Sequence, residues 1–200
     1  LARQYYQMTS MLIKAKVDFN AICDQVLPGM QELMNDHAGR HKLSDFVLRY
    51  HHTAHILKMG ETRFRKDDCK WAGKKGYRSR ERMAALIFAT AQNGIPVLPN
   101  APSTQIVITE AIRVLHTVEA SRDAILTQMQ ALAKTLPEYS LVREMPCIGD
   151  TLAPRLIAEI GDVRRFHSKR ALITYAGIDA PPYQSGKFCA NNRHISKRGN

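Results

Sequence analysis

Residues 2–27 read ARQYYQMTSMLIKAKVDFNAICDQVL and indicate the fold class of this chain. Apolar side chains recur here every three or four residues, with charged side chains between them. They are Tyr5, Met8, Leu12, Ala15, Phe19, Ile22 and Val26. This period is that of one face of an α-helix, and Pro28 and Gly29 end or kink the helix. A helix of this length needs a partner for its apolar stripe.

A second long run without proline or glycine covers residues 103–136. It predicts another long helix, with Ser103 or Thr104 as the N-cap after Pro102 and Pro137 as the stop. Its apolar positions include Ile106, Ile112, Leu115, Ile125, Met129 and Leu132. Two long helices of similar period predict an antiparallel coiled coil. The alternative is that each helix packs separately into a globular bundle.

The residues between these helices, 35–101, read as a helical insertion. Short helices are predicted at 30–34, 43–50 and 53–59, and a longer one at 79–93, which Gly94 and Pro96 end.

Within this insertion, residues 63–82 carry nine lysines and arginines interleaved with Phe64, Trp71 and Tyr77. This combination suits a nucleic-acid backbone with stacked bases. The candidate backbone contacts are Lys74, Lys75 and Arg78. The alternative is a solvated charged face that the tryptophan anchors to the core.

Residues 141–161 read LVREMPCIGDTLAPRLIAEIG and predict a helix-hairpin-helix. A short helix ends near Met145, a tight turn covers 146–149, and a second helix begins near Thr151. In such a unit the N–H groups of the turn and the start of the second helix face a phosphate. The candidate contacts are Pro146, Ile148 and Gly149, while Cys147 stands where the first glycine of the turn is usual. The alternative is an ordinary αα-corner.

Further on, Ser168 is predicted to cap a short helix at 170–176 that Gly177 closes. An irregular or weakly extended loop to residue 192 and the start of a helix near Ser196 follow. No strand is convincing, so the predicted fold is all-α. The expected parts are a first coiled-coil helix (1–34), the insertion (35–101), a second coiled-coil helix (102–137) and a small domain (138–200) truncated at its C-terminal end.

An isolated serine, Ser185, lies in this last part between Gln184 and Gly186. The cationic or titratable residues that follow it, with no acid among them, are Lys187, Arg193, His194, Lys197 and Arg198. A hydroxyl in such surroundings suits work on a phosphodiester, whose charge the cations stabilise. The alternative is a basic surface loop in which the serine has no role.

The composition favours a polyanionic partner, because 29 lysines and arginines face 18 acids and give a net charge of +11. Nucleic acid is the leading candidate. No apolar run approaches the ~20 residues of a membrane span, and nothing resembles a signal peptide. The four cysteines are far apart, which indicates reduced thiols in a cytoplasmic protein. We predict no metal site, and interpret the histidine group as surface or half-buried residues: His37, His41, His51, His52 and His55.

Five sequence blocks occur in a fixed order. They are Pro-x-Ile-Gly from Pro146, Ala-Glu-Ile-Gly-Asp-x-x-Arg-Phe from Ala158, Leu-x-x-Tyr-Ala-Gly-Ile from Leu172, Gln-Ser-Gly-Lys from Gln184 and Ile-Ser-Lys-Arg-Gly-Asn from Ile195. Together they resemble the C-terminal transposase domain of the insertion sequence 110/116/902 family, which includes the pilin-gene invertase and bridge-RNA-guided recombinases. The resemblance is dense over 145–200. It is looser for the two long helices, which resemble the family's connecting coiled coil.

The resemblance implies a two-part DNA recombinase. In such enzymes an N-terminal RuvC-like domain binds Mg²⁺ through carboxylates, and the C-terminal domain supplies a serine that becomes covalently joined to DNA. Ser185 is the serine carried over, with Lys187, Arg193 and Arg198 as phosphate clamps and Lys197 in the last matching block.

No strand-borne set of acids precedes Leu1, so we expect a fragment without its own cofactor that is inactive alone. The expected partners are DNA, a guide RNA as a further candidate, and a second copy bound through the long helices. The expected location is the bacterial cytoplasm, in association with the nucleoid. The rival interpretation is a non-catalytic helix-hairpin-helix module that only binds nucleic acid.

Overall fold

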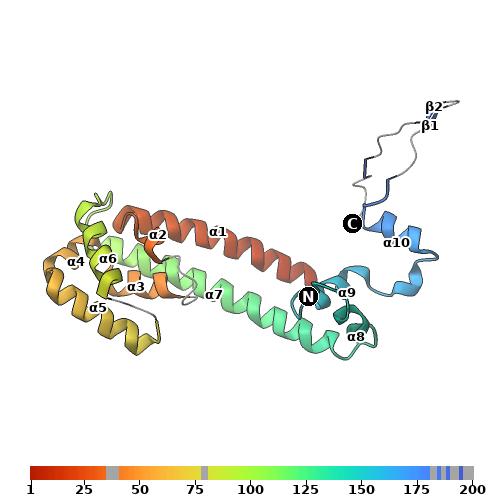
Figure 1. The fold of residues 1–200 in the computed structure, drawn as a ribbon, viewed down its shortest axis with the longest axis horizontal. Coiled ribbons are helices and arrows are strands. Elements are labelled where there is room, and N and C mark those ends of the chain that lie inside the picture. The colour runs from red at the N-terminus through yellow and green to blue at the C-terminus, as the bar shows by residue number, and fades with distance from the viewer. Residues whose placement is uncertain (35–40, 78–80, 181–183, 186–187, 190–193, 196–200) are drawn as a thin grey trace. The chain divides into compact units, whose positions relative to one another are not determined.

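The structure, a computed structural model, describes residues 1–34, 41–77, 81–180, 184–185, 188–189 and 194–195. The chain divides into two compact units, Leu1–Ala131 and Leu132–Asn200, which are described in turn (Figure 1). Helices make up nearly all the regular structure of the described residues, and the exceptions are the two-residue strands β1 (Gln184–Ser185) and β2 (Phe188–Cys189). The predicted all-α fold class is confirmed. None of the helices in these ranges is both long and apolar enough to cross a bilayer.

Helix α1 (Ala2–Val26) follows the predicted stripe closely. Its buried side chains are Tyr5, Leu12, Ala15, Phe19, Cys23 and Val26. Cys23 is buried in addition to the expected positions, and burial, with the nearby Asp24 charge, raises the pKa of its thiol to about 12. The helix ends before Pro28-Gly29, as predicted. Gly29 has a φ of 76°, in the left-handed region that glycine adopts most readily, and α2 (Met30–Met34) follows.

Helix α7 (Pro102–Ala133) begins one residue earlier than predicted. Pro102 takes the first helical position, where its missing N–H costs nothing, so the proposed N-caps Ser103 and Thr104 are wrong. The Thr104 hydroxyl instead donates to the Pro99 carbonyl at 2.8 Å. The helix also ends before Leu136, because Thr135 and Leu136 donate to carbonyls three residues earlier, which tightens the last turn.

The buried stripe of α7 differs from the predicted one. Its N-terminal part consists of Thr104, Ile108, Ile112, Leu115 and Glu119. Ile106 is 64% exposed because it lies two residues from both Thr104 and Ile108, on the far side of the helix. Leu132, also expected inside, is 56% exposed. In Figure 1, α1 and α7 run antiparallel, and both contribute to one core, while coiled-coil packing between them stays a prediction.

The insertion folds into four helices within the described residues: α3 (Lys42–Tyr50), α4 (Thr53–Met59), α5 (Glu61–Lys75) and α6 (Glu81–Asn93). Three of them were predicted to within two residues, although Ser79 lies outside the described ranges. Helix α5 was missed because its sequence is dominated by charge. It buries only Phe64, Asp68, Trp71 and Ala72.

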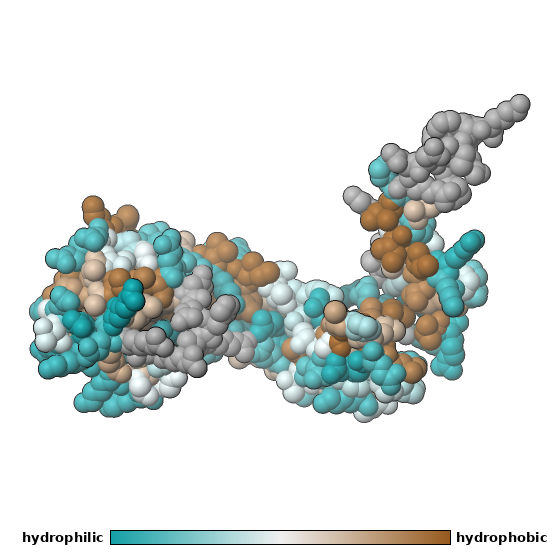
Figure 2. Space-filling view, viewed as in Figure 1, coloured by the Kyte–Doolittle hydropathy of each residue, from teal (hydrophilic) through white to brown (hydrophobic). Residues whose placement is uncertain are grey.

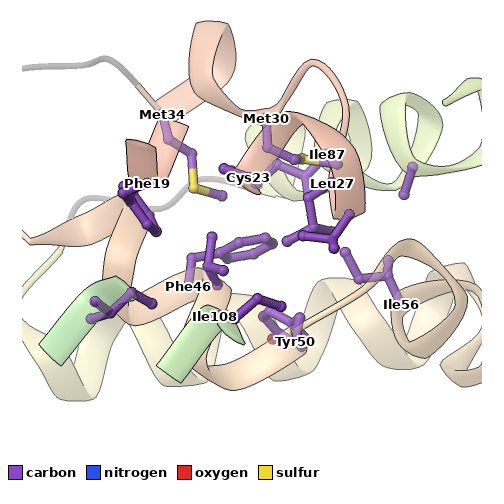
Figure 3. Close-up of a cluster of buried hydrophobic side chains, with 14 of the residues drawn as sticks. Phe19, Cys23, Leu27, Met30, Met34, Phe46, Tyr50, Ile56, Ile87 and Ile108 are labelled. Carbon is purple, nitrogen blue, oxygen red and sulfur yellow. The ribbon is translucent and has the colours of Figure 1, made fainter. Parts of the chain in front are cut away.

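The core of the first unit gathers side chains from all of the helices α1 to α7 around Phe46 and Tyr50 (Figure 3). The ring centroids of Phe46 and Tyr50 are 4.6 Å apart, and Phe64 lies 5.1 Å from Tyr50. Trp71 meets Phe46 edge-on at 6.0 Å. Because Phe64 and Trp71 belong to this core, they are not free to stack on bases, and that part of the interpretation of residues 63–82 is wrong.

The histidines that lie near one another in sequence hold local structure. His52 is buried and caps α4: its Nδ1 accepts from the Ala54 N–H at 3.0 Å, so the Nε2–H donates to the Leu98 carbonyl at 3.0 Å. His41 is half-buried and His55 is exposed, while His37 lies outside the described residues.

The second unit contains α8 (Glu138–Arg143), α9 (Leu152–Ile160), a 3-10 turn η1 (Val163–Arg165), α10 (Lys169–Tyr175) and the strand pair. It buries little among its described residues: Ala153, Pro154 and Gly177 are the buried ones after α8 begins. Figure 2 shows hydrophobic residues at its surface. The exposed large hydrophobic side chains of this unit include Leu141, Met145 and Ile178. Because this unit buries so few side chains, its conformation depends mainly on its local turns.

Candidate nucleic-acid interface and serine hairpin

The turn between α8 and α9 is tied back to α8 by one arginine. The Arg143 guanidinium lies 3.0 Å from the Asp150 carboxylate and also donates to the Ile148 carbonyl. The Tyr139 hydroxyl donates to the same carboxylate at 3.1 Å. These contacts are partly solvated, so each contributes modestly, but together they fix the turn against the first helix.

The predicted contact residues of this turn face solvent. Pro146 and Gly149 are exposed, and Ile148 is half-buried. A Cβ added to Gly149 would meet nothing within 4 Å, so a ligand can approach the backbone closely there. The Gly149 carbonyl accepts from Leu152 and Ala153 at the start of α9. The turn is therefore open on its outer side, but the N–H groups of Ile148, Leu152 and Ala153 already donate to the Met145 and Gly149 carbonyls, so phosphate contact stays a prediction.

Cys147 adopts a φ of 66°, in the left-handed region. A side chain in that region meets the following carbonyl, at a cost of roughly 1–2 kcal/mol. The usual turn glycine avoids this cost, so the substitution noticed in the sequence has a defined backbone consequence.

Two of the five sequence blocks meet around Tyr175. The Arg165 guanidinium lies over the rings of Phe166 and Tyr175, at 4.7 and 4.6 Å from their centroids. The two rings are 5.2 Å apart, and the Tyr175 hydroxyl donates to the Glu159 carbonyl at 3.1 Å. The sequence blocks that contain Arg165 and Tyr175 are thus joined by a cation–π contact and a hydrogen bond.

Helix α10 has the caps that the sequence predicts. The Ser168 hydroxyl accepts from the Ala171 N–H at 3.3 Å. At the other end, the Gly177 N–H donates to the Thr174 carbonyl and the Ile178 N–H to the Ile173 carbonyl. This is the Schellman motif, in which Gly177 adopts a φ of 69°. This end of α10 leads toward the strand pair.

Ser185 is the last residue of β1, and its backbone pairs with Phe188 in the antiparallel partner β2. Gln184 pairs with Cys189. The sequence predicted an irregular or weakly extended loop, and the described residues of this segment form a short antiparallel strand pair.

Several predicted contacts lie outside the described residues, namely Arg78, Gly186, Lys187, Arg193, Lys197 and Arg198. Lys74 and Lys75 lie at the end of α5 in the first unit, where the Lys75 ammonium is 3.1 Å from the Asp45 carboxylate. Lys75 is therefore engaged within its own unit.

One group of cations was not among the predicted contacts. Residues 163–170 contain four exposed ones, Arg164, Arg165, Lys169 and Arg170, between η1 and the first turn of α10. The backbone N–H and the side chain of Arg164 donate hydrogen bonds to the Asp162 carboxylate, which lowers the pKa of Asp162. The ionised carboxylate therefore neutralises one of the four cations, Arg164. The signal that could have found the group is the run VRRFHSKR, which has no acid.

Residues 139–200 match the family described as transposase IS116/IS110/IS902. Over 176 residues the chain is 24% identical to an uncharacterised insertion element IS110 protein of Streptomyces coelicolor, a match that covers 88% of this chain and 42% of that protein. The chain thus spans less than half the length of this relative. No solved structure matches significantly.

Residues 139–200, most of the second unit, are thus similar to this transposase family, which confirms the resemblance seen in the five sequence blocks.

Proposed function

We propose that this chain supplies the serine-bearing part of a DNA transposase, with Ser185 as the nucleophile that attacks a DNA phosphodiester. The observation that carries the proposal is the match of residues 139–200 to a transposase family. Within that segment, the backbone of Ser185 is held in a strand pair at the point where β1 ends. A serine whose backbone is fixed by strand pairing is suited to meet a bulky substrate.

In the proposed reaction the Ser185 oxygen attacks phosphorus and the bond from phosphorus to the 3′ oxygen breaks. The products are a phosphoserine link to one DNA end and a free 3′-hydroxyl, which gains the proton that the serine loses. Lys187, Arg193 and Arg198 are proposed to neutralise the charge on the phosphate oxygens, and Lys197 to bind nearby. A serine hydroxyl is a weak nucleophile without a group that accepts its proton.

The described residues do not fit a magnesium site, since no three histidine, cysteine or acidic side chains among them gather to hold a metal. We assign no step of the reaction to a metal held by these residues. The Mg²⁺ site implied by the family resemblance is proposed for a RuvC-like domain in another part of the full-length enzyme, and this chain is proposed to be inactive alone.

DNA is the proposed substrate, with a guide RNA as a second candidate partner and the nucleoid as the place of action. The open turn at Pro146, Ile148 and Gly149 supports backbone contact, because the solvent-facing glycine allows close approach. The exposed cations of residues 163–170 provide further charge in the same unit.

A second copy of the chain is proposed to bind through the long helices. Helix α1 exposes Tyr6, Ile13 and Val17, which are 43%, 60% and 61% exposed. Their spacing of seven and four residues places them on one face of α1, apart from its buried stripe. An apolar face of this kind on a long helix is typical of helix–helix association.

The test is Ser185→Ala in the full-length transposase, with Ser103→Ala on the exposed first turn of α7 as the matched control. The Ser185 variant should lose strand exchange and the covalent protein–DNA adduct on a denaturing gel, while its DNA affinity is unchanged. Strand exchange at the control's rate would refute the nucleophile and leave the non-catalytic binding module as the function.

A further inference from the structure

The first unit contains an open pocket of about 490 Å³ where three helices meet. Arg49 comes from the end of α3, Lys58 from the end of α4, and Arg63 and Asp67 from α5. Gly60, with a φ of 74°, joins α4 directly to α5 and brings these side chains to one opening. This volume lies in the range of pockets that bind small ligands.

The pocket carries excess positive charge, because Arg49, Lys58 and Arg63 face the single carboxylate of Asp67. Arg49 already engages that carboxylate through two guanidinium nitrogens, at 2.8 and 3.2 Å. Among the described residues, Lys58 and Arg63 have no ion-pair partner. The charge of Arg63 acts on Asp67 at longer range, but three cations facing one carboxylate still leave an excess of positive charge at the opening.

Asp67 holds the pocket in shape. Partial burial alone would raise its pKa, but hydrogen bonds from Arg49 and from the Tyr50 hydroxyl, the latter at 2.9 Å, outweigh that effect and lower the pKa. The ionised carboxylate orients the Arg49 guanidinium. His55 also lines the pocket, and its Nδ1 donates to the Tyr50 carbonyl at 3.2 Å.

The positive charge continues beyond the pocket along α5. From Arg63, exposed lysines follow at Lys66, Lys70 and Lys74, at spacings of three, four and four residues. These spacings place them on one helix face over about 16 Å. A single small anion in the pocket would leave this ridge uncompensated, whereas a chain of phosphates would not.

We propose that the Arg49–Lys58–Arg63 pocket binds one backbone phosphate of a nucleic acid, and that the lysine ridge of α5 follows the neighbouring phosphates. This site lies in the first unit and does not depend on Ser185 or on any cleavage step. Its ligand chemistry is a phosphodiester, which DNA and RNA share.

The test measures binding by the full chain, without cleavage, of duplex DNA and of single-stranded RNA by fluorescence anisotropy at several salt concentrations. The variant is Lys58→Gln/Arg63→Gln, and the control is Lys14→Gln/Lys16→Gln on α1, which removes equal charge from exposed positions. Circular dichroism melting checks that both variants fold.

The pocket variant should lower the slope of log affinity against log salt by about 2 for the bound nucleic acid, because two phosphate contacts are lost. Its affinity should fall several-fold further than that of the control. The arm that shows this loss identifies DNA or RNA as the source of the phosphate. Equal slopes and affinities for the two variants in both arms would overturn the proposal, whatever the outcome for Ser185→Ala.

Discussion

The turn between α8 and α9 allows a direct test of the left-handed backbone at Cys147. Replacing Cys147 by glycine removes the steric cost of a φ of 66°, roughly 1–2 kcal/mol. Glycine also loses about 0.5–1 kcal/mol more backbone entropy on folding. The difference predicts that Cys147→Gly stabilises the second unit by about 0.5–1 kcal/mol.

Two companion variants separate backbone strain from the loss of the thiol. Cys147→Asn should also stabilise, because asparagine tolerates the left-handed region, whereas Cys147→Val should destabilise, because a β-branched side chain fits it worst. All three remove the exposed thiol. The expected order of stability of the three variants therefore depends on how well each residue tolerates the left-handed φ, and not on the loss of the thiol.

Amide hydrogen exchange at Leu152 and Ala153 measures the effect where it arises, since both N–H groups donate to the Gly149 carbonyl. Cys147→Gly should slow their exchange about two- to fivefold if local opening limits it. In a thermal melt, the transition of this unit should rise by about 2–8 °C. A glycine variant that exchanges faster than the valine variant would refute the assignment of strain to this residue.

Two further predictions concern the first unit. Because hydrogen bonds lower the pKa of Asp67 in the folded state, its contribution to stability is present above the ordinary pKa of 3.8 and is lost as pH falls below it. Asp67→Asn should therefore flatten the acid limb of unfolding free energy against pH, and an unchanged limb would contradict this. Ile13→Lys/Val17→Lys should lower the molar mass measured by light scattering to that of one chain, and an unchanged mass would exclude α1 as the contact.

The sequence predicted most of the helices because their apolar side chains recur with the helical period. Helix α5 was not predicted because its buried face includes the charged Asp68 and the small Ala72. The helical period of its apolar side chains is therefore hard to recognise among the charged residues. The stripe of α7 was misplaced because this helix is apolar on several sides: Ile106 and Ile108 are equally good candidates in sequence, and only tertiary packing buries the second.

The candidate site was predictable only in part. The sequence blocks identified the residues of the turn and the serine, and the departure from glycine at Cys147 was visible in the sequence. The cation–π contacts of Arg165 with Phe166 and Tyr175 join residues ten positions apart around a capped helix, which no local pattern encodes. The pocket at Arg49, Lys58 and Arg63 likewise draws one cation from each of three helices.

The only tryptophan of the chain, Trp71, is buried in the first unit beside Phe46 and Tyr77. Its fluorescence, excited beyond the absorption of tyrosine, therefore reports the unfolding of the first unit alone. The second unit contributes through tyrosines such as Tyr139 and Tyr175. Because Tyr5, Tyr6, Tyr50 and Tyr77 belong to the first unit, tyrosine emission mixes both units, whereas tryptophan emission follows loss of the first unit without any added label.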